Sequence, residues 1–137
     1  MLELKKSEIQ SLFDLSAGAE AIRQSFIAQS QERVQVPDVT YLEFQDVNGD
    51  CHVKSGYIDG TEGFVVKIAT GFYNNPARGL PSSNGMNLLF CAKTGQTLAF
   101  LNDEGWLTDI RTGLGGALAT LALARADFTK VLIVGGG

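Results

Sequence analysis

Apolar runs alternate with polar turns through the middle of this 137-residue sequence and predict β-strands. The runs are rich in β-branched and aromatic residues, which favour a pleated, half-buried surface. One of the turns contains Asn48-Gly49, a pair that tolerates the positive φ angles of a tight hairpin. We therefore predict an antiparallel meander with strands at 39–45, 51–58, 64–72, 86–92 and 97–103, and with a long loop at 73–85.

Helical spacing of apolar residues appears on both sides of the meander. Ser7 followed by Gln10 is a capping-box pattern that predicts a short helix, and Ser16 is expected to cap a second helix. From residue 106 onward, leucine and isoleucine recur at helical spacing, with Thr108 as the expected N-cap.

The residues at 131–134 form an apolar run that leads into three consecutive glycines. A strand that ends in a glycine-rich turn is how a dinucleotide-binding unit begins, because glycines let the backbone approach a pyrophosphate. The expected fold class is therefore α+β: N-terminal helices packed on a mostly antiparallel sheet, then a connecting helix and one strand of the kind that opens a dinucleotide-binding unit.

Composition and charge argue against several classes of partner. A hydrophobic content of 45% and a charged content of 19% are ordinary for a globular domain. The net charge of -4 comes without a basic stripe, which argues against nucleic acid. No apolar run approaches the roughly 20 residues of a membrane helix, and the N-terminus lacks the apolar centre of a signal peptide. We therefore expect a cytoplasmic protein that binds neither nucleic acid nor membrane.

The cysteines and the single histidine are not spaced as zinc ligands, so no metal site is expected. Cys51 next to His52 suggests a nucleophile and its base, but neighbouring residues on a strand point to opposite faces. We interpret Cys51 and Cys91 as structural thiols and His52 as a surface or core residue. The acids in the predicted turns are interpreted as solvated hairpin tips: Asp46, Asp50, Asp59 and Glu62.

Three stretches occur in order along the second half of the chain: VVKIATGFYNNPARGLPSSNG at 65–85, TGQTLAFLNDEGWLTDIRTG at 94–113 and LARADFTKVLIVGGG at 123–137. They contain a lysine on a strand, an N-P-x-x-G-L-P loop, a T-G hairpin, an L-T-x-x-R-T helix start and a strand ending in glycines. Together these motifs resemble the ornithine cyclodeaminase/mu-crystallin family. Residues 1–64 fit the helix-helix-hairpin opening of that family less specifically.

The resemblance implies two domains, of which the first binds substrate and dimerises through its sheet, while the second is a Rossmann domain that holds NAD(P). On this basis residues 1–105 form the substrate/dimerisation domain and 106–128 the connecting helix. Residues 129–137 are then the first strand and glycine stump of a truncated dinucleotide-binding domain. Full-length relatives are NAD(P)-dependent amino or imino acid cyclodeaminases or reductases. We expect the chain alone to bind no NAD(P) and to be catalytically inactive.

Lys67 lies inside an apolar strand, where an ammonium group needs a partner or a cavity. The resemblance assigns it to the catalytic position facing the substrate, and the alternative is an edge lysine that turns to solvent. Arg111 resembles the family's arginine for the substrate carboxylate, which a guanidinium fork can hold by two hydrogen bonds. Its alternative is a surface arginine paired with Asp109 or Asp103.

The sequence departs from the family at one position. The family often has a second carboxylate-binding arginine after a proline, where this chain has Asp38. Lys54 on the neighbouring strand is the candidate substitute in substrate binding, with a solvent-facing lysine as the equal alternative. The residues that resemble the family's cofactor contacts are Thr112, Ser82, Ser83, Asn84, Gly135 and Gly137.

Two further functions remain open beside the truncated oxidoreductase. The chain can be a dimeric structural module, a homodimer or higher oligomer built through its sheet. It can also be a weak binder of a small amino or keto acid, held between Lys67 and Arg111.

Overall fold

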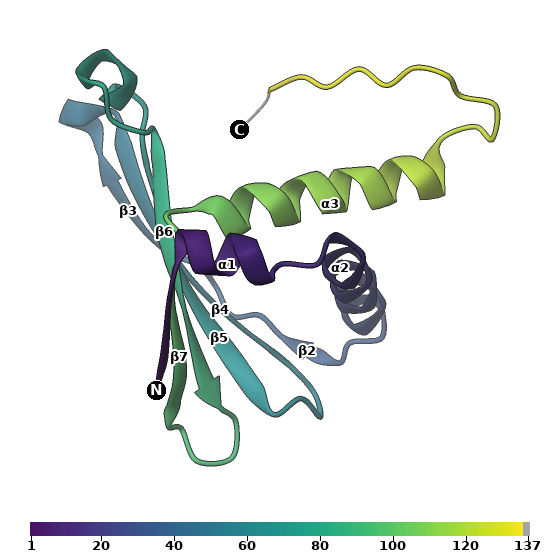
Figure 1. Cartoon of the computed structure of the whole chain (residues 1–137), viewed down its shortest axis with the longest axis horizontal. Helices are drawn as coiled ribbons and strands as arrows, with labels where there is room; N and C mark the ends of the chain where they lie inside the picture. Colours follow the sequence, from purple (N-terminus) through teal and green to yellow (C-terminus); the bar gives the residue numbers. More distant parts are fainter. Residues whose placement is uncertain (136–137) are drawn as a thin grey trace.

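The computed structural model describes residues 1–135 as one sheet and three α-helices (Figure 1). Two short 3₁₀ turns, Gln45–Val47 and Asn75–Arg78, lie between strands. In chain order the other elements are β1 (Leu2–Lys5), α1 (Lys6–Leu12), α2 (Leu15–Ser30), β2 (Val34–Gln35), β3 (Thr40–Phe44), β4 (Gly49–Ile58), β5 (Gly63–Phe72), β6 (Ser83–Cys91), β7 (Thr97–Asn102) and α3 (Trp106–Leu123).

The sheet confirms the predicted meander and adds two strands to it. Its order is β1-β7-β6-β5-β4-β2, and β3 also pairs with β4. The consecutive strands from β3 to β7 pair with one another in antiparallel fashion. The unpredicted β1 runs parallel to β7, with Leu2 opposite Ala99. The fold is thus the α+β class expected from the sequence.

All three helices lie on one side of the sheet, and the other side is bare in Figure 1. Because side chains alternate along a strand, each strand contributes to both sides. The helix-facing side carries a cross-strand row formed by Lys54, Lys67 and Asn87. We call the opposite surface the open side; it carries the row of Val53, Ile68 and Met86.

The helix starts differ from the predicted caps. The Asp14 carboxylate, not Ser16, caps α2 by accepting the Ala17 N–H at 2.7 Å. Helix α1 begins after Lys5, whose backbone N–H donates to the Glu8 carboxylate at 2.8 Å. A charged oxygen is a stronger acceptor than a hydroxyl, which explains why carboxylates occupy both helix starts.

The connecting helix α3 begins at the predicted residue but ends at Leu123, not at residue 128. Its N-cap is Gly105, with a φ of 86°, and the expected cap Thr108 lies inside the first turn. Residues 124–135 contain neither helix nor strand, so the strand predicted from residue 129 is not formed in the described part. An isolated strand cannot satisfy its backbone N–H and C=O groups, and no other described strand lies beside this exposed run.

The buried hydrophobic residues of the described chain are Ile9, Ala28 and Ala99, from α1, α2 and β7. The core therefore lies between the helices and their side of the sheet. Asp103, after β7, is fully buried despite its charge. Among residues 1–135, no helix combines the length and the apolar composition needed to cross a membrane.

Candidate functional site

Lys67 lies near the middle of β5, on the helix-facing side of the sheet. Lys54 on β4 is its direct cross-strand neighbour, and Asn87 on β6 is opposite it on the other flank. Lys67 is half-buried and Lys54 is exposed. Strand pairing thus places two ammonium groups side by side beneath the helices.

Helix α3 brings Arg111 to the same place from above the sheet. Lys54, Lys67 and Arg111 line one pocket of about 350 Å³, although they lie far apart in the sequence. Lys67 and Arg111 also line a second hollow of about 320 Å³, whose other walls are mostly apolar residues of α2 and α3. Arg111 forms no ion pair with Asp109 or Asp103 in the described structure.

The environment of Lys67 lowers the pKa of its side chain. Burial lowers the pKa of its ammonium group, and the positive charges of Arg111 and Lys54 lower it further. The Asp103 carboxylate opposes this shift. The ammonium Nζ donates to the Thr108 hydroxyl at 3.4 Å, a long hydrogen bond. Lys67 therefore releases its proton more readily than a solvated lysine does.

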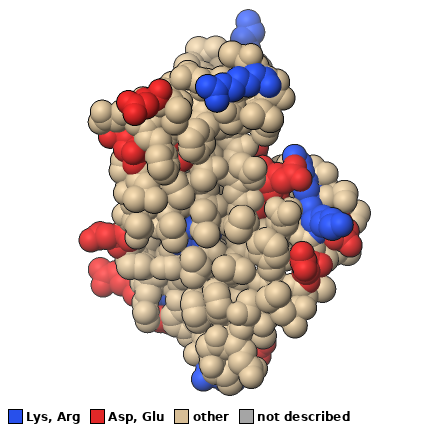
Figure 2. Space-filling model, turned by 90° about the vertical axis from the view of Figure 1, so that its left-hand side faces the viewer, with Lys and Arg blue, Asp and Glu red and all other residues tan. Residues whose placement is uncertain are grey.

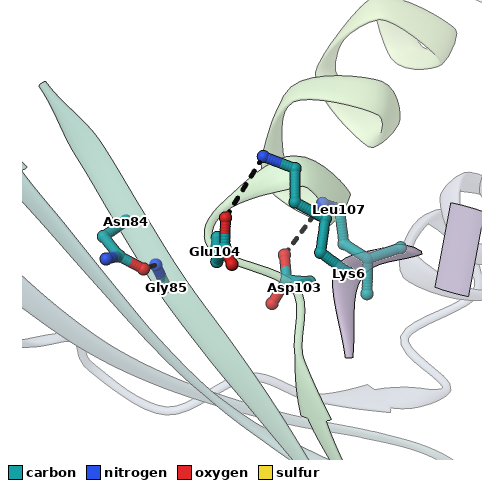
Figure 3. A network of polar contacts seen from close by, with 6 residues as sticks. All are labelled: Lys6, Asn84, Gly85, Asp103, Glu104 and Leu107. Atoms are coloured by element: carbon teal, nitrogen blue, oxygen red, sulfur yellow. Dashed lines mark hydrogen bonds and ion pairs between the residues drawn. The ribbon is translucent and has the colours of Figure 1, made fainter. Parts of the chain in front are cut away.

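Asp103 fixes the start of α3 relative to the sheet. Its carboxylate accepts the Leu107 N–H at 2.8 Å and the Asn87 side-chain amide at 3.0 Å. Figure 3 shows Asp103 below the first turn of the helix, aimed at Leu107. The Leu107 N–H at this helix start is therefore not free to bind an anion, because Asp103 already supplies the negative charge.

A second cluster on the pocket wall was missed at the sequence level. Asp50 lies in β4 rather than at a hairpin tip, and its carboxylate is 3.3 Å from the His52 Nε2. Its other oxygen accepts the Tyr73 hydroxyl at 2.9 Å, and the Tyr41 ring packs on His52 with centroids 4.9 Å apart. The signal available in the sequence was alternation, since residues 50, 52 and 54 share one face of a strand.

The candidate cofactor residues divide into three groups. Ser82, Ser83 and Asn84 line the same pocket as Lys67, and β6 already begins at Ser83. Thr112 is exposed in the second turn of α3, where its hydroxyl donates to the Thr108 carbonyl. Gly135 is exposed with a φ of 89°, and Gly137 lies outside the described residues.

These groups do not form a dinucleotide site within the described chain. A pyrophosphate is usually held by a glycine-rich turn at the start of a helix, and no helix follows Leu123 among the described residues. Among the candidate cofactor residues, only Ser82, Ser83 and Asn84 share a pocket with Lys67. The described residues likewise hold no group of three His, Cys, Asp or Glu that could bind a metal.

Comparison with known proteins finds relatives that match nearly the whole of this chain. The chain is 38% identical to a putative dehydrogenase of Rhizobium meliloti over 135 residues, which are 98% of this chain and 41% of that protein. Its fold is similar to Thermococcus litoralis Δ1-pyrroline-2-carboxylate reductase in complex with NADH and L-proline, with a TM-score of 0.86 and 32% identity. An archaeal alanine dehydrogenase dimer with bound NAD gives a TM-score of 0.84 and 28% identity.

The two structural matches cover 93% of this chain but only 39% and 38% of the reductase and dehydrogenase chains. The chain therefore spans about two fifths of the length of these relatives. The model of the ornithine cyclodeaminase/mu-crystallin family matches residues 1–137. The chain belongs to the ornithine cyclodeaminase/mu-crystallin family.

Proposed function

We propose that this chain is the substrate-binding part of an NAD(P)-dependent oxidoreductase that acts on a small amino or imino acid. The observation that carries the proposal is the shared pocket of Lys67 and Arg111, which come from the sheet and from α3. Family relatives with matching folds include a pyrroline-2-carboxylate reductase bound to L-proline and an alanine dehydrogenase.

In this proposal the two cations have different roles. Arg111 holds the substrate carboxylate through its planar fork of N–H donors. Lys67, whose pKa is lowered mainly by burial, exchanges a proton at the reacting nitrogen or carbon. NAD(P), bound by the whole protein, supplies or accepts the hydride.

We further propose that the 137-residue chain by itself has no NAD(P)H-dependent activity. Its support is the lack of an assembled pyrophosphate site in the described residues. Spectrophotometric assays of the purified chain with NADH or NADPH and a cyclic imino acid should show no saturable oxidation. Saturable turnover would contradict this part of the proposal.

Carboxylate binding can be tested without turnover. We expect L-proline and pyruvate to bind the chain weakly, at millimolar concentration, in NMR titrations that follow the backbone amides of β5 and α3. Lys67→Met and Arg111→Gln should each weaken binding about tenfold, the loss of roughly 1.4 kcal/mol. Arg23→Gln is the matched control, since Arg23 pairs with Glu20 on the exposed face of α2. Equal affinities of all variants would contradict the assignment.

A second function, assembly into a homodimer through the sheet, is supported by the open side. Leu42, Phe44 and Leu98 on this side are each more than two fifths exposed, and no described helix covers them. Figure 2 shows this face as largely uncharged, with acidic and basic side chains gathered toward its margins. An uncharged apolar surface of this kind is typical of protein interfaces. The archaeal relative is itself a dimer.

A further inference from the structure

We propose that the pocket shared by Lys54, Lys67 and Arg111 takes an acid with two carboxylates rather than one. This inference rests on the proposed function, because it assigns a substrate class to the same site. It goes beyond that function in giving Lys54 a carboxylate separate from the one held by Arg111.

The first argument is the arrangement of the two lysines. Lys54 and Lys67 are directly opposed on antiparallel strands, with side chains on the same side of the sheet. Like charges in this position destabilise a strand pair unless an anion lies between them. Neither lysine has an acidic partner within 4.0 Å in the described structure. An anion held by both lysines would offset their repulsion.

The second argument is that the nearby carboxylates are already engaged or point elsewhere. Asp103 is held by Asn87 and by the backbone of Leu107. Asp50 contacts His52 and Tyr73, at a different part of the pocket wall. Asp109 lines the pocket but is exposed and forms no ion pair in the described structure. None of these carboxylates therefore forms an ion pair with Lys54, Lys67 or Arg111 in the described structure.

The third argument is the separation of the cations between two walls. The lysines extend from the sheet, whereas Arg111 extends from α3, which crosses above it. A guanidinium fork uses both oxygens of a carboxylate when it binds in the bidentate mode. The lysine pair then needs a second acidic group on the same ligand. The pocket volume of about 350 Å³ lies within the range of sites for small molecules.

The proposal is tested with two probes that differ by a single carboxylate. Succinate and butyrate are titrated into the full 137-residue chain by isothermal calorimetry, for the wild type, Lys54→Gln and the control Lys93→Gln. Lys93 is exposed in the β6–β7 hairpin, away from the pocket. We expect wild type to bind succinate at least about tenfold more tightly than butyrate. Lys54→Gln should remove most of this preference, while Lys93→Gln should retain it.

The possible failures are distinguishable. Equal affinities for succinate and butyrate, or a preference that survives Lys54→Gln, would overturn the two-carboxylate assignment and leave the proposed function intact. Inorganic phosphate binding as tightly as succinate would also overturn it, since the site would then be a general anion site. Binding of neither acid by a chain with a native circular dichroism spectrum would refute both proposals. Arg111→Gln serves as a second variant, and it should weaken both acids.

Discussion

Asn87 and Asp103 are joined by a hydrogen bond of 3.0 Å that connects the middle of the sheet to the start of α3. Asn87 is also the cross-strand neighbour of Lys67, and α3 carries Arg111. This one contact therefore relates the positions of the two proposed functional cations.

Removing the Asp103 carboxylate should destabilise the fold. Asp103→Ala leaves the Leu107 N–H without its capping acceptor and the Asn87 amide without its partner, and both groups are part-buried. We expect the free energy of unfolding to fall by about 2 kcal/mol, from the lost cap and the unpaired donors. Urea unfolding followed by circular dichroism measures this change.

Asp109→Ala is the matched control, because Asp109 lies in the same turn but is exposed and has no recorded partner among the described residues. A loss for Asp103→Ala no larger than that for Asp109→Ala would contradict the capping role.

The lowered pKa of Lys67 predicts a specific pH dependence of stability. Burial and the charge of Arg111 make the folded chain bind the Lys67 proton more weakly than the unfolded chain does. The unfolded state therefore binds more protons between the folded-state pKa and the ordinary alkaline value, so stability rises with pH across that interval. Lys67→Met should flatten this rise in urea unfolding measured at successive alkaline pH values.

The cause of the shift can be tested separately. Arg111→Gln removes one of the two positive neighbours and should raise the pKa of Lys67, as followed by the NMR chemical shift of its side-chain carbon next to the ammonium. Arg23→Gln should leave that titration unchanged. The same Lys67 pKa in wild type and Arg111→Gln would show that the arginine does not act on it.

Gly85 is required by the close approach of the β5 backbone to β6 at this position. A Cβ at this position would lie 2.8 Å from the Ile68 carbonyl oxygen and 3.6 Å from the Gly105 Cα. Gly85→Ala should therefore destabilise the chain by about 1–3 kcal/mol, because backbone atoms must move.

Gly56→Ala provides the comparison, because a Cβ at this strand position meets no atom within 4 Å. We expect a stability equal to or slightly above wild type, as the alanine reduces the freedom of the unfolded chain. The melting temperatures of Gly85→Ala and Gly56→Ala, measured by thermal unfolding, test both expectations. Similar melting temperatures for the two would refute the steric argument.

The open side of the sheet predicts a dimer that a charge can disrupt. Ile68 lies in its central row, between Val53 and Met86. Ile68→Lys should yield a monomer in sedimentation velocity runs at concentrations where wild type is dimeric, because an unpaired ammonium would be buried in the interface. Gln10→Lys, on exposed α1, should remain dimeric. A wild-type monomer at every concentration would refute the dimer.

The central meander could be predicted because its signals are local. Strand composition and the Asn48-Gly49 turn are visible within a few residues, and Asn48 does adopt the left-handed conformation, with a φ of 52°. The convergence of Lys67 and Arg111 was expected from the resemblance, and the structure places both on one pocket. Their chemical roles remain predictions.

Other features depend on contacts between distant residues and could not be predicted from local pattern. β1 forms because the backbone of β7 provides hydrogen-bonding partners for it. The four residues of β1 alone contain no strong strand signal. Asp103 was considered only as a possible partner of Arg111, but the structure buries it and uses its carboxylate to accept the Leu107 N–H. Asp50 was placed at a hairpin tip because β4 begins two residues earlier than its apolar run.

The parallel pair of β1 and β7 has a consequence for synthesis of the protein. Leu2 pairs with Ala99 and Lys5 with Asn102. β1 therefore leaves the ribosome well before β7, the strand with which it pairs. Until β7 has emerged, β1 has no strand to pair with, and this edge of the sheet remains incomplete. Ordering of the N-terminus is therefore a late event in biogenesis, and it reports completion of the meander.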